Sequence, residues 1–306
     1  MNNEKLKIGA GYVLICLLWG STWMAIRIGL DYLTPFISCG IRFLIGSVFI
    51  YLIMLYKKVK LQRDKRSIQL YLFMGFFSFV IPFGLVYWAE QHVPSGLASV
   101  LFSIFPFLVI LFSRIALPEN KIGIYQVLGV ILGFVGLIVI FSQGLSFESD
   151  FDFWGMGAVF LSAAMQAVVV VVMKKYGGEL HALSMNFIPV LIGGIFLTLA
   201  GLIFEDSSTW QFSTEAMMSI MYLAFFGTVL TFTTYYWLLK KINVVILSLS
   251  NFITPVIALF LGWLFLSEVL TPRDLLGSSF VLIGILFANF RGLKNYYLLN
   301  LAKKHD

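Results

Sequence analysis

The stretch GAGYVLICLLWGSTWMAIRI (residues 9–28) is an apolar run of 20 residues, and about 20 such residues let a helix cross the hydrocarbon core of a membrane. Nine further apolar runs of similar length follow it, separated by short polar segments. The expected spans are residues 9–28, 36–56, 68–89, 95–116, 122–141, 153–173, 182–204, 216–239, 244–266 and 275–290. The sequence therefore predicts an all-α integral membrane protein with ten transmembrane helices in the cell (plasma or inner) membrane.

The composition supports this class of protein. Hydrophobic residues make up 60% of the 306-residue chain and charged residues only 12%, whereas soluble proteins are about 25% charged. Ten spans would use about 200 positions at about 20 residues each. We therefore expect no separate soluble domain.

The positively charged residues predict how the chain crosses the membrane. The net charge is +6, and all but three of the 21 Lys and Arg residues lie on alternate loops, with the largest clusters at residues 57–66 and 291–304. The intervening loops around residues 148–152 and 205–215 are acidic. By the positive-inside rule both termini are cytoplasmic. A basic surface for nucleic acid is not expected, because membrane topology accounts for these cations.

The two halves of the chain show weak internal similarity. At an offset of 149 residues, Tyr87-Trp88 matches Tyr236-Trp237, Pro106 matches Pro255 and Glu119 matches Glu268. Because each half has five spans, an odd number, the second half enters the membrane from the opposite side. This predicts two inverted five-helix repeats with a site at their interface. We place the first repeat at residues 1–145, the second at 146–292 and a cytoplasmic tail at 293–306.

Pro106 and Pro255 each fall near the middle of an expected span, where proline removes a backbone hydrogen bond and kinks the helix. Paired interruptions in corresponding helices point to a transport site, so we predict that both prolines act as hinges or gates. The alternative is that they serve packing alone, since membrane helices tolerate proline. Pro82 and Pro189 lack counterparts in the other half and are weaker candidates.

Small residues in the fifth span predict close helix packing. Gly129, Gly133 and Gly136 lie along this span, and Gly129 and Gly136 match Gly277 and Gly284 at an offset of 148. Glycines at such a spacing allow two helix backbones to approach closely. We expect packing within the bundle, with dimerisation as the alternative.

The sequence offers little for catalysis. His92, His181 and His305 lie in short loops or the tail, and no HExxH, Gly-x-Ser-x-Gly or P-loop motif is present. Cys16 and Cys39 lack the spacing of a zinc site and are expected as small buried hydrophobic side chains. We expect neither an enzyme nor a bound metal or cofactor, and no ATP hydrolysis by this chain.

Charged side chains within the hydrocarbon region are costly and usually functional. Arg42 lies about 10 Å inside the second span. It either faces an anionic group of a substrate, a carboxylate or a phosphate, or forms a fixed ion pair with Glu90 or Asp31. Arg27 and Arg114 lie nearer span ends, where their side chains can reach the membrane interface.

Polar and aromatic residues near the middle of the spans are candidates for a cavity lining. Trp23 lies one helical turn beyond Trp19, so both indoles share a helix face. The alternative for each aromatic residue is a place against lipid or in a packing gap, because aromatics make up 17% of the chain. The predicted substrate-binding residues are Trp19, Ser21, Thr22, Trp23 and Arg42 of the first half, with Gln166, Asn186 and Asn251 of the second.

Three segments together resemble a known family. They run from Trp19-Gly20-Ser21-Thr22 to Arg42-Phe43-Leu44, from Ser95 to Leu-Pro-Glu at Glu119, and from Ile253 to Leu-Ser-Glu at Glu268. In order and spacing the chain is similar to two repeats of the EamA family of the drug/metabolite transporter superfamily. The resemblance implies ten helices around a central cavity, alternating access, and export of small metabolites or amphipathic toxic compounds. The chain departs from the family in Leu-Pro-Glu, where Leu-Gly-Glu is usual, and in Gln166, where an aromatic residue is common.

These features predict a secondary transporter that exports a small metabolite, such as an amino acid, or an amphipathic toxic compound. A flippase for a lipid-linked intermediate would use the same fold, and a non-transporting sensor or enzyme is the other class. No carboxylate or histidine is evident deep in a span, so facilitated diffusion and proton antiport both stay open. The expected partners are a small-molecule substrate and the lipid bilayer, not nucleic acid, for a monomer or homodimer.

Overall fold

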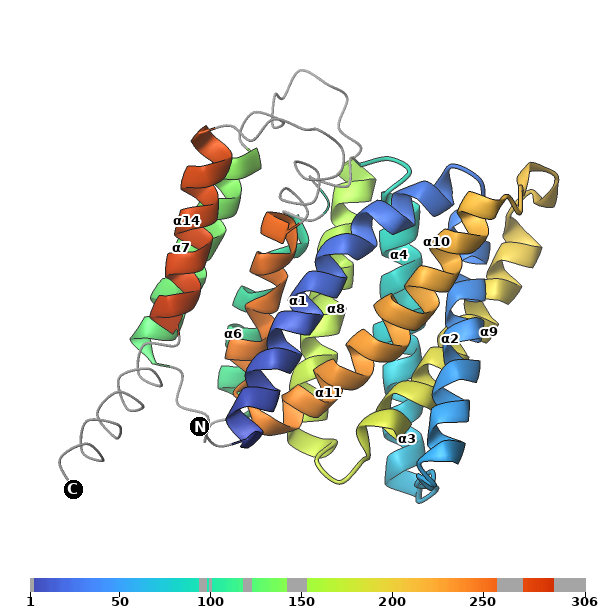
Figure 1. Ribbon diagram of the computed structural model, residues 1–306, viewed down its shortest axis with the longest axis horizontal. Coiled ribbons are helices and arrows are strands. Elements are labelled where there is room, and N and C mark those ends of the chain that lie inside the picture. The colour runs from blue at the N-terminus through green and yellow to red at the C-terminus, as the bar shows by residue number, and fades with distance from the viewer. Residues whose placement is uncertain are drawn as a thin grey trace.

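The computed structural model describes residues 3–93, 98, 101–117, 123–141, 153–257 and 272–288. Helices account for most of these residues, and no strand occurs among them (Figure 1). The expected tail with His305, and the paired residues Glu119 and Glu268, lie outside the described residues. The prediction of an all-α protein is confirmed for the described part of the chain.

Six helices are long and apolar enough to cross a membrane. Each coincides with an expected span, and a helix satisfies all of its backbone polar groups internally where water is absent. They are α1 (Asn3–Leu30), α2 (Pro35–Tyr56), α3 (Lys65–Met74) continued by η1 (Gly75–Val80) and α4 (Ile81–Ala89), α8 (Phe153–Tyr176), α9 (Ala182–Phe204), and α10 (Thr214–Ala224) continued by η3 (Phe225–Leu230) and α11 (Thr231–Lys241).

Four shorter apolar helices lie within the other expected spans. They are α6 (Phe105–Ala116), α7 (Ile124–Phe141), the helix that begins with α12 (Val244–Ser248) and continues to Ile257, and α14 (Pro272–Ala288). A single 3-10 turn, η2 (Ser207–Thr209), lies between α9 and α10. Every expected span therefore contains a helix, while ten membrane crossings and cytoplasmic termini stay predictions.

Polar residues and proline fix where several helices begin. Asp64, Ser213 and Asn243 cap α3, α10 and α12, and each side chain accepts a hydrogen bond from a backbone N–H of the first turn. Pro35 occupies the first turn of α2, where a missing N–H costs least. These local signals place the helix starts close to the polar breaks in the sequence.

Two π-helical turns occupy corresponding positions in the two halves. η1 begins at Gly75 and η3 at Phe225, 150 residues apart, close to the offset of 149 found in the sequence. Single π-turns inside α-helices are rare and occur frequently at functional sites. Their matching positions support the internal duplication, and each contributes groups to the site described below.

The helices α7 and α14 cross at glycines. A Cβ atom on Gly129 would meet the backbone oxygen of Gly284, and one on Gly136 would lie 2.5 Å from the backbone oxygen of Gly277. The two helices run antiparallel, because the residue number rises along one as it falls along the other. α14 therefore covers the glycine face of α7, which serves packing within the chain.

The helices α2 and α9 also pack along each other in an antiparallel pair. A Cβ atom on Gly194 would lie 2.7 Å from the backbone nitrogen of Leu44, and one on Gly201 would lie 2.9 Å from that of Ile37. α2 and α9 are the second spans of their halves, just as α7 and α14 are the fifth. Two corresponding pairs of helices thus meet where the halves join.

Pro106 does not lie inside a continuous helix. It occupies the first turn of α6, because residues 103–104 form a turn that separates α6 from the preceding helical residues. Proline lacks an N–H and its ring clashes with the carbonyl four residues earlier, so a helix restarts there more readily than it runs through. Pro255 lies within helical residues 250–257, after a turn at Leu249. The expected mid-span kink at Pro106 is therefore a break between helices.

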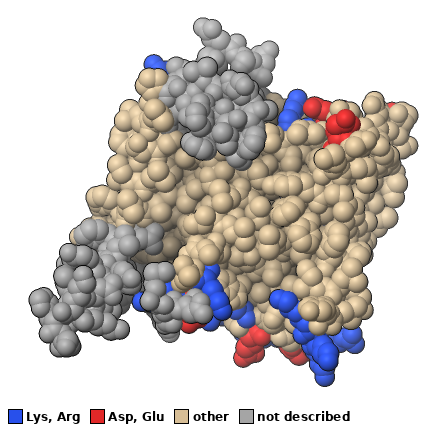
Figure 2. All heavy atoms as spheres, viewed as in Figure 1, with Lys and Arg blue, Asp and Glu red and all other residues tan. Residues whose placement is uncertain are grey.

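Charged groups gather at the two ends of the helices on the face shown in Figure 2, with a broad band of uncharged residues between them. Large apolar side chains such as Val48, Leu52 and Leu199 are about half exposed on the outside of the bundle. An apolar surface of this extent suits contact with lipid chains. The fold is therefore that of a helical membrane protein.

Candidate functional site

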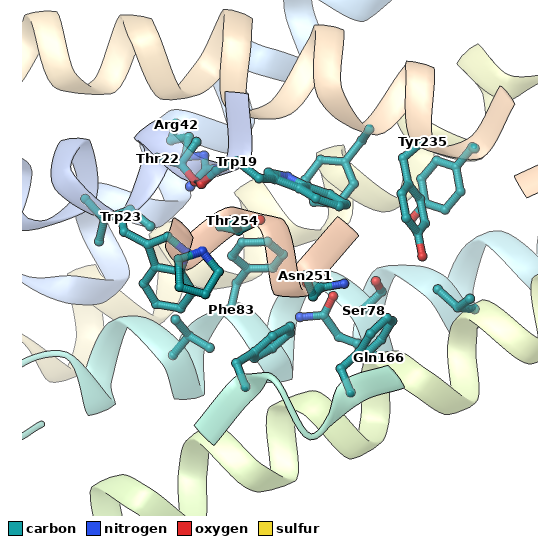
Figure 3. Close-up of a pocket in the computed structure, with 18 residues that line it drawn as sticks. Trp19, Thr22, Trp23, Arg42, Ser78, Phe83, Gln166, Tyr235, Asn251 and Thr254 are labelled. Carbon is teal, nitrogen blue, oxygen red and sulfur yellow. Dashed lines mark hydrogen bonds between the residues drawn. The ribbon is translucent and has the colours of Figure 1, made fainter. Parts of the chain in front are cut away.

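A cavity of about 100 Å³ lies between the two halves, and its wall combines aromatic and aliphatic side chains with a few polar groups, as is typical of small-molecule sites. Figure 3 shows its side chains, which come from α1, α2, η1, α4, helical residues 101–102, α6, α8, α11 and the helix at residues 250–257. The lining residues are Trp19, Thr22, Trp23, Ile26, Arg42, Ser78, Phe83, Val86, Phe102, Phe105, Gln166, Val170, Phe232, Tyr235, Tyr236, Asn251, Thr254 and Pro255.

Most of the predicted substrate-binding residues are among these lining residues. They are Trp19, Thr22, Trp23, Arg42, Gln166 and Asn251. Of the two predicted gating prolines, Pro255 lines the cavity and Pro106 is buried in α6 beside the lining residue Phe105. The structure therefore brings together residues from five separate helical segments. The sequence named these residues individually but did not show that they lie close together.

Ser21 and Asn186 lie outside the lining and connect helices instead. The Ser21 hydroxyl lies 2.5 Å from that of Tyr222, which joins α1 to α10. The fully buried Asn186 side chain donates from Nδ2 to Thr233 Oγ1 at 3.0 Å and to the carbonyl of Thr228 at 3.4 Å. Both residues sit on faces turned toward a neighbouring helix, which residue type alone does not reveal.

Arg42 is buried in the bundle with its guanidinium at the cavity wall. Nε donates to Thr228 Oγ1 at 3.0 Å, Nη1 to the Tyr87 hydroxyl at 3.0 Å and Nη2 to the carbonyl of Gly227 at 3.2 Å. Thr228 and Gly227 belong to the π-turn η3, so a residue of the first half is held by the second. A Cβ atom on Gly227 would lie 3.2 Å from Nη2, so glycine leaves room for this guanidinium.

The expected alternative, a fixed ion pair of Arg42, is wrong for the described residues. Asp31 instead lies 3.9 Å from Arg27, and both of these side chains are more than half exposed. Neither carboxylate oxygen of Glu90 has a hydrogen-bond partner, although this side chain is buried. Within the described residues Arg42 therefore has only neutral hydrogen-bond partners.

A buried guanidinium with neutral partners is an attractive place for an anion. Arginine stays protonated in proteins and offers five N–H donors in a fixed plane, of which the hydrogen bonds above use three. The rings of Phe43 and Phe83, with centroids 5.3 and 5.6 Å from Cζ, add weaker cation–π stabilisation. A carboxylate or phosphate that entered the cavity would supply the missing negative charge.

Aromatic rings form much of the cavity wall. Trp19 of α1 packs against Phe232 and Tyr235 of α11, with ring centroids 5.7 and 5.1 Å apart. Phe83 of α4 packs against Phe232 at 5.9 Å. Tyr235 and Tyr236 of α11 also line the cavity, although the sequence did not single them out as site residues, because only packing separates a cavity wall from an interfacial belt.

Polar groups reach the cavity from both halves. Figure 3 shows Gln166, Asn251, Ser78 and Thr254 directed into it. Asn251 Nδ2 donates to the carbonyl of Ser248 at 3.1 Å, which leaves its side-chain oxygen to accept another bond. The sequence missed Thr254, which follows Asn251 by three positions on the same helix face.

The other residues singled out in the sequence lie away from the cavity. Arg27 and Arg114 are exposed near the ends of α1 and α6. Cys16 and Cys39 are free and buried, as expected for small apolar side chains. His181 caps α9 by accepting a hydrogen bond from the backbone N–H of Leu183.

Both halves of the chain match one family model, described as the EamA-like transporter family, at residues 7–142 and 153–290. The two matched segments together cover most of the chain. Their boundary falls close to the break between repeats that the offset analysis places after residue 145.

Several curated proteins and a solved structure are similar along nearly their whole length. The uncharacterized transporter YoaV of Bacillus subtilis is 28% identical over 93% of this chain and 97% of its own. The protein PagO of Salmonella typhimurium is 28% identical over 84% of each chain. The uncharacterized inner membrane transporter YedA of Escherichia coli is 25% identical over 88% of this chain and 86% of its own. A crystal structure superposes with a TM-score of 0.80 at 19% identity over 94% of this chain and 98% of its own, which shows a shared fold.

Proposed function

This chain belongs to the EamA-like transporter family and is a multi-pass transporter of the cell membrane, and from this premise we propose that it exports a small metabolite through the cavity between its halves. The substrate is an amino acid or a related compound with an anionic group, and an amphipathic toxic compound is the other candidate. The carrier is secondary, with no chemical reaction of its own.

The buried Arg42 is the observation that carries this proposal. Its guanidinium faces the cavity, and the described residues offer it no carboxylate partner. A charged residue inside a membrane protein is expensive to keep and points to a substrate or ion pathway. An anionic group of the substrate at Arg42 would balance this charge during transport.

Alternating access by two inverted repeats is the proposed mechanism. The antiparallel pairs α2 with α9 and α7 with α14 support it, because each joins corresponding spans of the two halves. The π-turns η1 and η3 at matching positions support it as well. In this mechanism one half rocks against the other, and the cavity between them opens first to one side and then to the other.

Pro106 and Pro255 are the proposed hinges of this motion. Pro106 begins α6 after the turn at residues 103–104, and Pro255 lies beyond the turn at Leu249 and contacts the cavity. A break in helical hydrogen bonding lets the two parts of a span move separately. The predicted substrate-binding set keeps Trp19, Thr22, Trp23, Arg42, Gln166 and Asn251, with Ser21 and Asn186 as supporting contacts.

The test is counterflow of labelled amino acids into proteoliposomes of the purified protein. We expect saturable uptake by the wild type, a loss of about tenfold or more in Arg42→Ala because a charge-assisted hydrogen bond is removed, and near wild-type uptake in Arg114→Ala. Arg114 is the matched control, because it is an exposed arginine near the end of α6. Equal uptake by the wild type and Arg42→Ala would overturn the proposal. Competition by phospholipid headgroups alone would instead indicate a lipid flippase.

A further inference from the structure

Glu90 is a buried carboxylate that the proposed function does not use. It caps the C-terminus of α4, directly after the span Lys65–Ala89, and its relative exposure is 3%. Both side-chain oxygens are shielded from solvent without a hydrogen-bond partner in the described structure. Burial of a polar group without a partner is costly, and native proteins rarely keep one that has no role.

Glu90 lies on the face of α4 that lines the cavity. Phe83 and Val86 are lining residues, and Glu90 follows them by seven and four positions, so all three share one side of the helix. The carboxylate is therefore about one helical turn beyond the last lining residue of α4, at the end away from α3.

The charged groups around Glu90 are mainly positive. Arg42 of α2 and Arg27 of α1 both act on its charge, and Arg27 is shared with Asp31. Tyr87, one turn earlier on α4, accepts a hydrogen bond from Arg42, and the first described turn of α8 near this end, residues 153–156, carries no ionisable side chain. Burial raises the pKa of Glu90 to about 8, and the charges of Arg27 and Arg42 partly oppose this rise.

We propose that Glu90 is the second charged contact of the substrate, whose primary ammonium group it binds while the anionic group lies at Arg42. This inference rests on the proposed function and narrows the substrate to a zwitterion. A buried guanidinium and a buried carboxylate that are not paired with each other leave one site for each charge of such a molecule. Each charge of the ligand would then compensate one that the fold leaves unpaired.

The side chains of the cavity wall narrow the range of candidate substrates further. Trp19, Trp23, Phe105 and Phe232 present aromatic surface between the polar groups, and aromatic rings pack favourably against one another. The ligand is therefore an amino acid with a large apolar side chain. When no ammonium group is present a proton occupies Glu90, so proton and substrate compete for one carboxylate. Such competition couples export of the substrate to entry of a proton.

Three probes that share one ring test the proposal by calorimetry on the purified full chain. They are phenylalanine, 3-phenylpropanoate, which lacks the ammonium group, and 2-phenylethylamine, which lacks the carboxylate. Each is titrated at pH 6 and pH 8 into the wild type, Glu90→Gln and Glu215→Gln. Glu215 is the matched control, because its carboxylate is exposed at the start of α10.

We expect the wild type to bind phenylalanine about tenfold or more tightly at pH 8 than at pH 6, because Glu90 ionises over this range. Glu90→Gln should lose this rise and bind phenylalanine about tenfold to a hundredfold more weakly at pH 8. Its binding of 3-phenylpropanoate should be unchanged or tighter, which also shows that the variant is folded. Glu215→Gln should behave as the wild type.

Two results would overturn the inference. One is wild-type phenylalanine binding by Glu90→Gln at both pH values, and the other is an equal loss of phenylalanine and 3-phenylpropanoate. If Arg42→Ala still loses both anionic probes in either case, the proposed function survives while the role of Glu90 does not. Binding of none of the three probes by the wild type would overturn the inference together with the amino-acid substrate.

Discussion

Glu90 and Glu205 are both glutamates at the C-terminal cap of a helix, yet their surroundings differ completely. Glu205, after α9, accepts hydrogen bonds from the backbone N–H groups of Phe36 at 2.7 Å and Ile37 at 3.0 Å and from the Thr34 hydroxyl at 2.7 Å. Glu90, after α4, has no partner in the described structure.

The difference separates a carboxylate with a structural role from the carboxylate that we propose as a ligand contact. The first N–H groups of α2 lack partners within the helix, and the N-terminus of a helix favours negative charge. Glu205 accepts the hydrogen bonds of these N–H groups and places a negative charge at this helix N-terminus, so it holds α9 against α2. Glu90 accepts no such hydrogen bonds, so its carboxylate is available to a ligand or a proton. The number of satisfied hydrogen bonds, rather than residue type or position in the helix, distinguishes the two.

The largest expected effect on stability comes from Glu205→Ala. This change leaves two backbone N–H groups of α2 and one hydroxyl without their charged acceptor. We therefore expect the free energy of unfolding to fall by about 3 kcal/mol. Thermal unfolding in detergent at pH 6 measures it. Asp206→Ala is the control, because Asp206 caps only the short exposed turn η2. An unchanged unfolding midpoint in Glu205→Ala would show that the Glu205 carboxylate does not stabilise the fold.

A smaller effect is expected from Thr34→Val. The Thr34 hydroxyl donates to Glu205 and accepts a hydrogen bond from Trp210 Nε1 at 2.7 Å. Removal of this hydroxyl should lower the free energy of unfolding by about 1 kcal/mol at pH 6, because the hydrogen bonds to Glu205 and from Trp210 are lost. In a double-mutant cycle with Glu205→Ala the two losses should not add, since the residues share one network. Full additivity would show that Thr34 and Glu205 act independently.

The smallest effect at pH 6 is expected from Glu90→Gln. No hydrogen bond is lost, and at this pH the Glu90 carboxyl is mostly protonated because burial raises its pKa to about 8. In the unfolded chain the carboxyl has its ordinary, lower pKa, so the wild type should lose stability as the pH rises toward 8. Unfolding midpoints from pH 5 to 8 should therefore diverge in favour of Glu90→Gln. Parallel curves would show that Glu90 is not a buried titrating group.

The sequence predicted the helical segments well, and it singled out Arg42, which the structure places at the cavity wall. Long apolar runs bounded by polar breaks located the six helices that are long enough to cross a membrane and the four shorter apolar helices, because the membrane demands about 20 apolar residues in each span. Arg42 stood out because a charge in such a run is rare and costly. Weak matches at an offset of 149 residues indicated the duplication that η1 and η3 later supported.

Other features of the site could not be read from the sequence. Glu90 was considered only as an ion-pair partner of Arg42, because at the end of a span it resembles an ordinary interfacial residue. Ser21 and Asn186 were placed in the cavity, although their hydrogen bonds join helices. Phe83 and Phe232 were overlooked among the many aromatics of the chain.

The sequence by itself determined which segments are apolar helices, where they break and which buried residue carries a charge, since these depend on composition and short-range spacing. Only the tertiary structure decided which side chains share the cavity and which carboxylate is satisfied. Those properties depend on how helices distant in sequence rotate and pack against one another. Arg42 between Tyr87 and Thr228, and Glu90 without a partner, are outcomes of that packing.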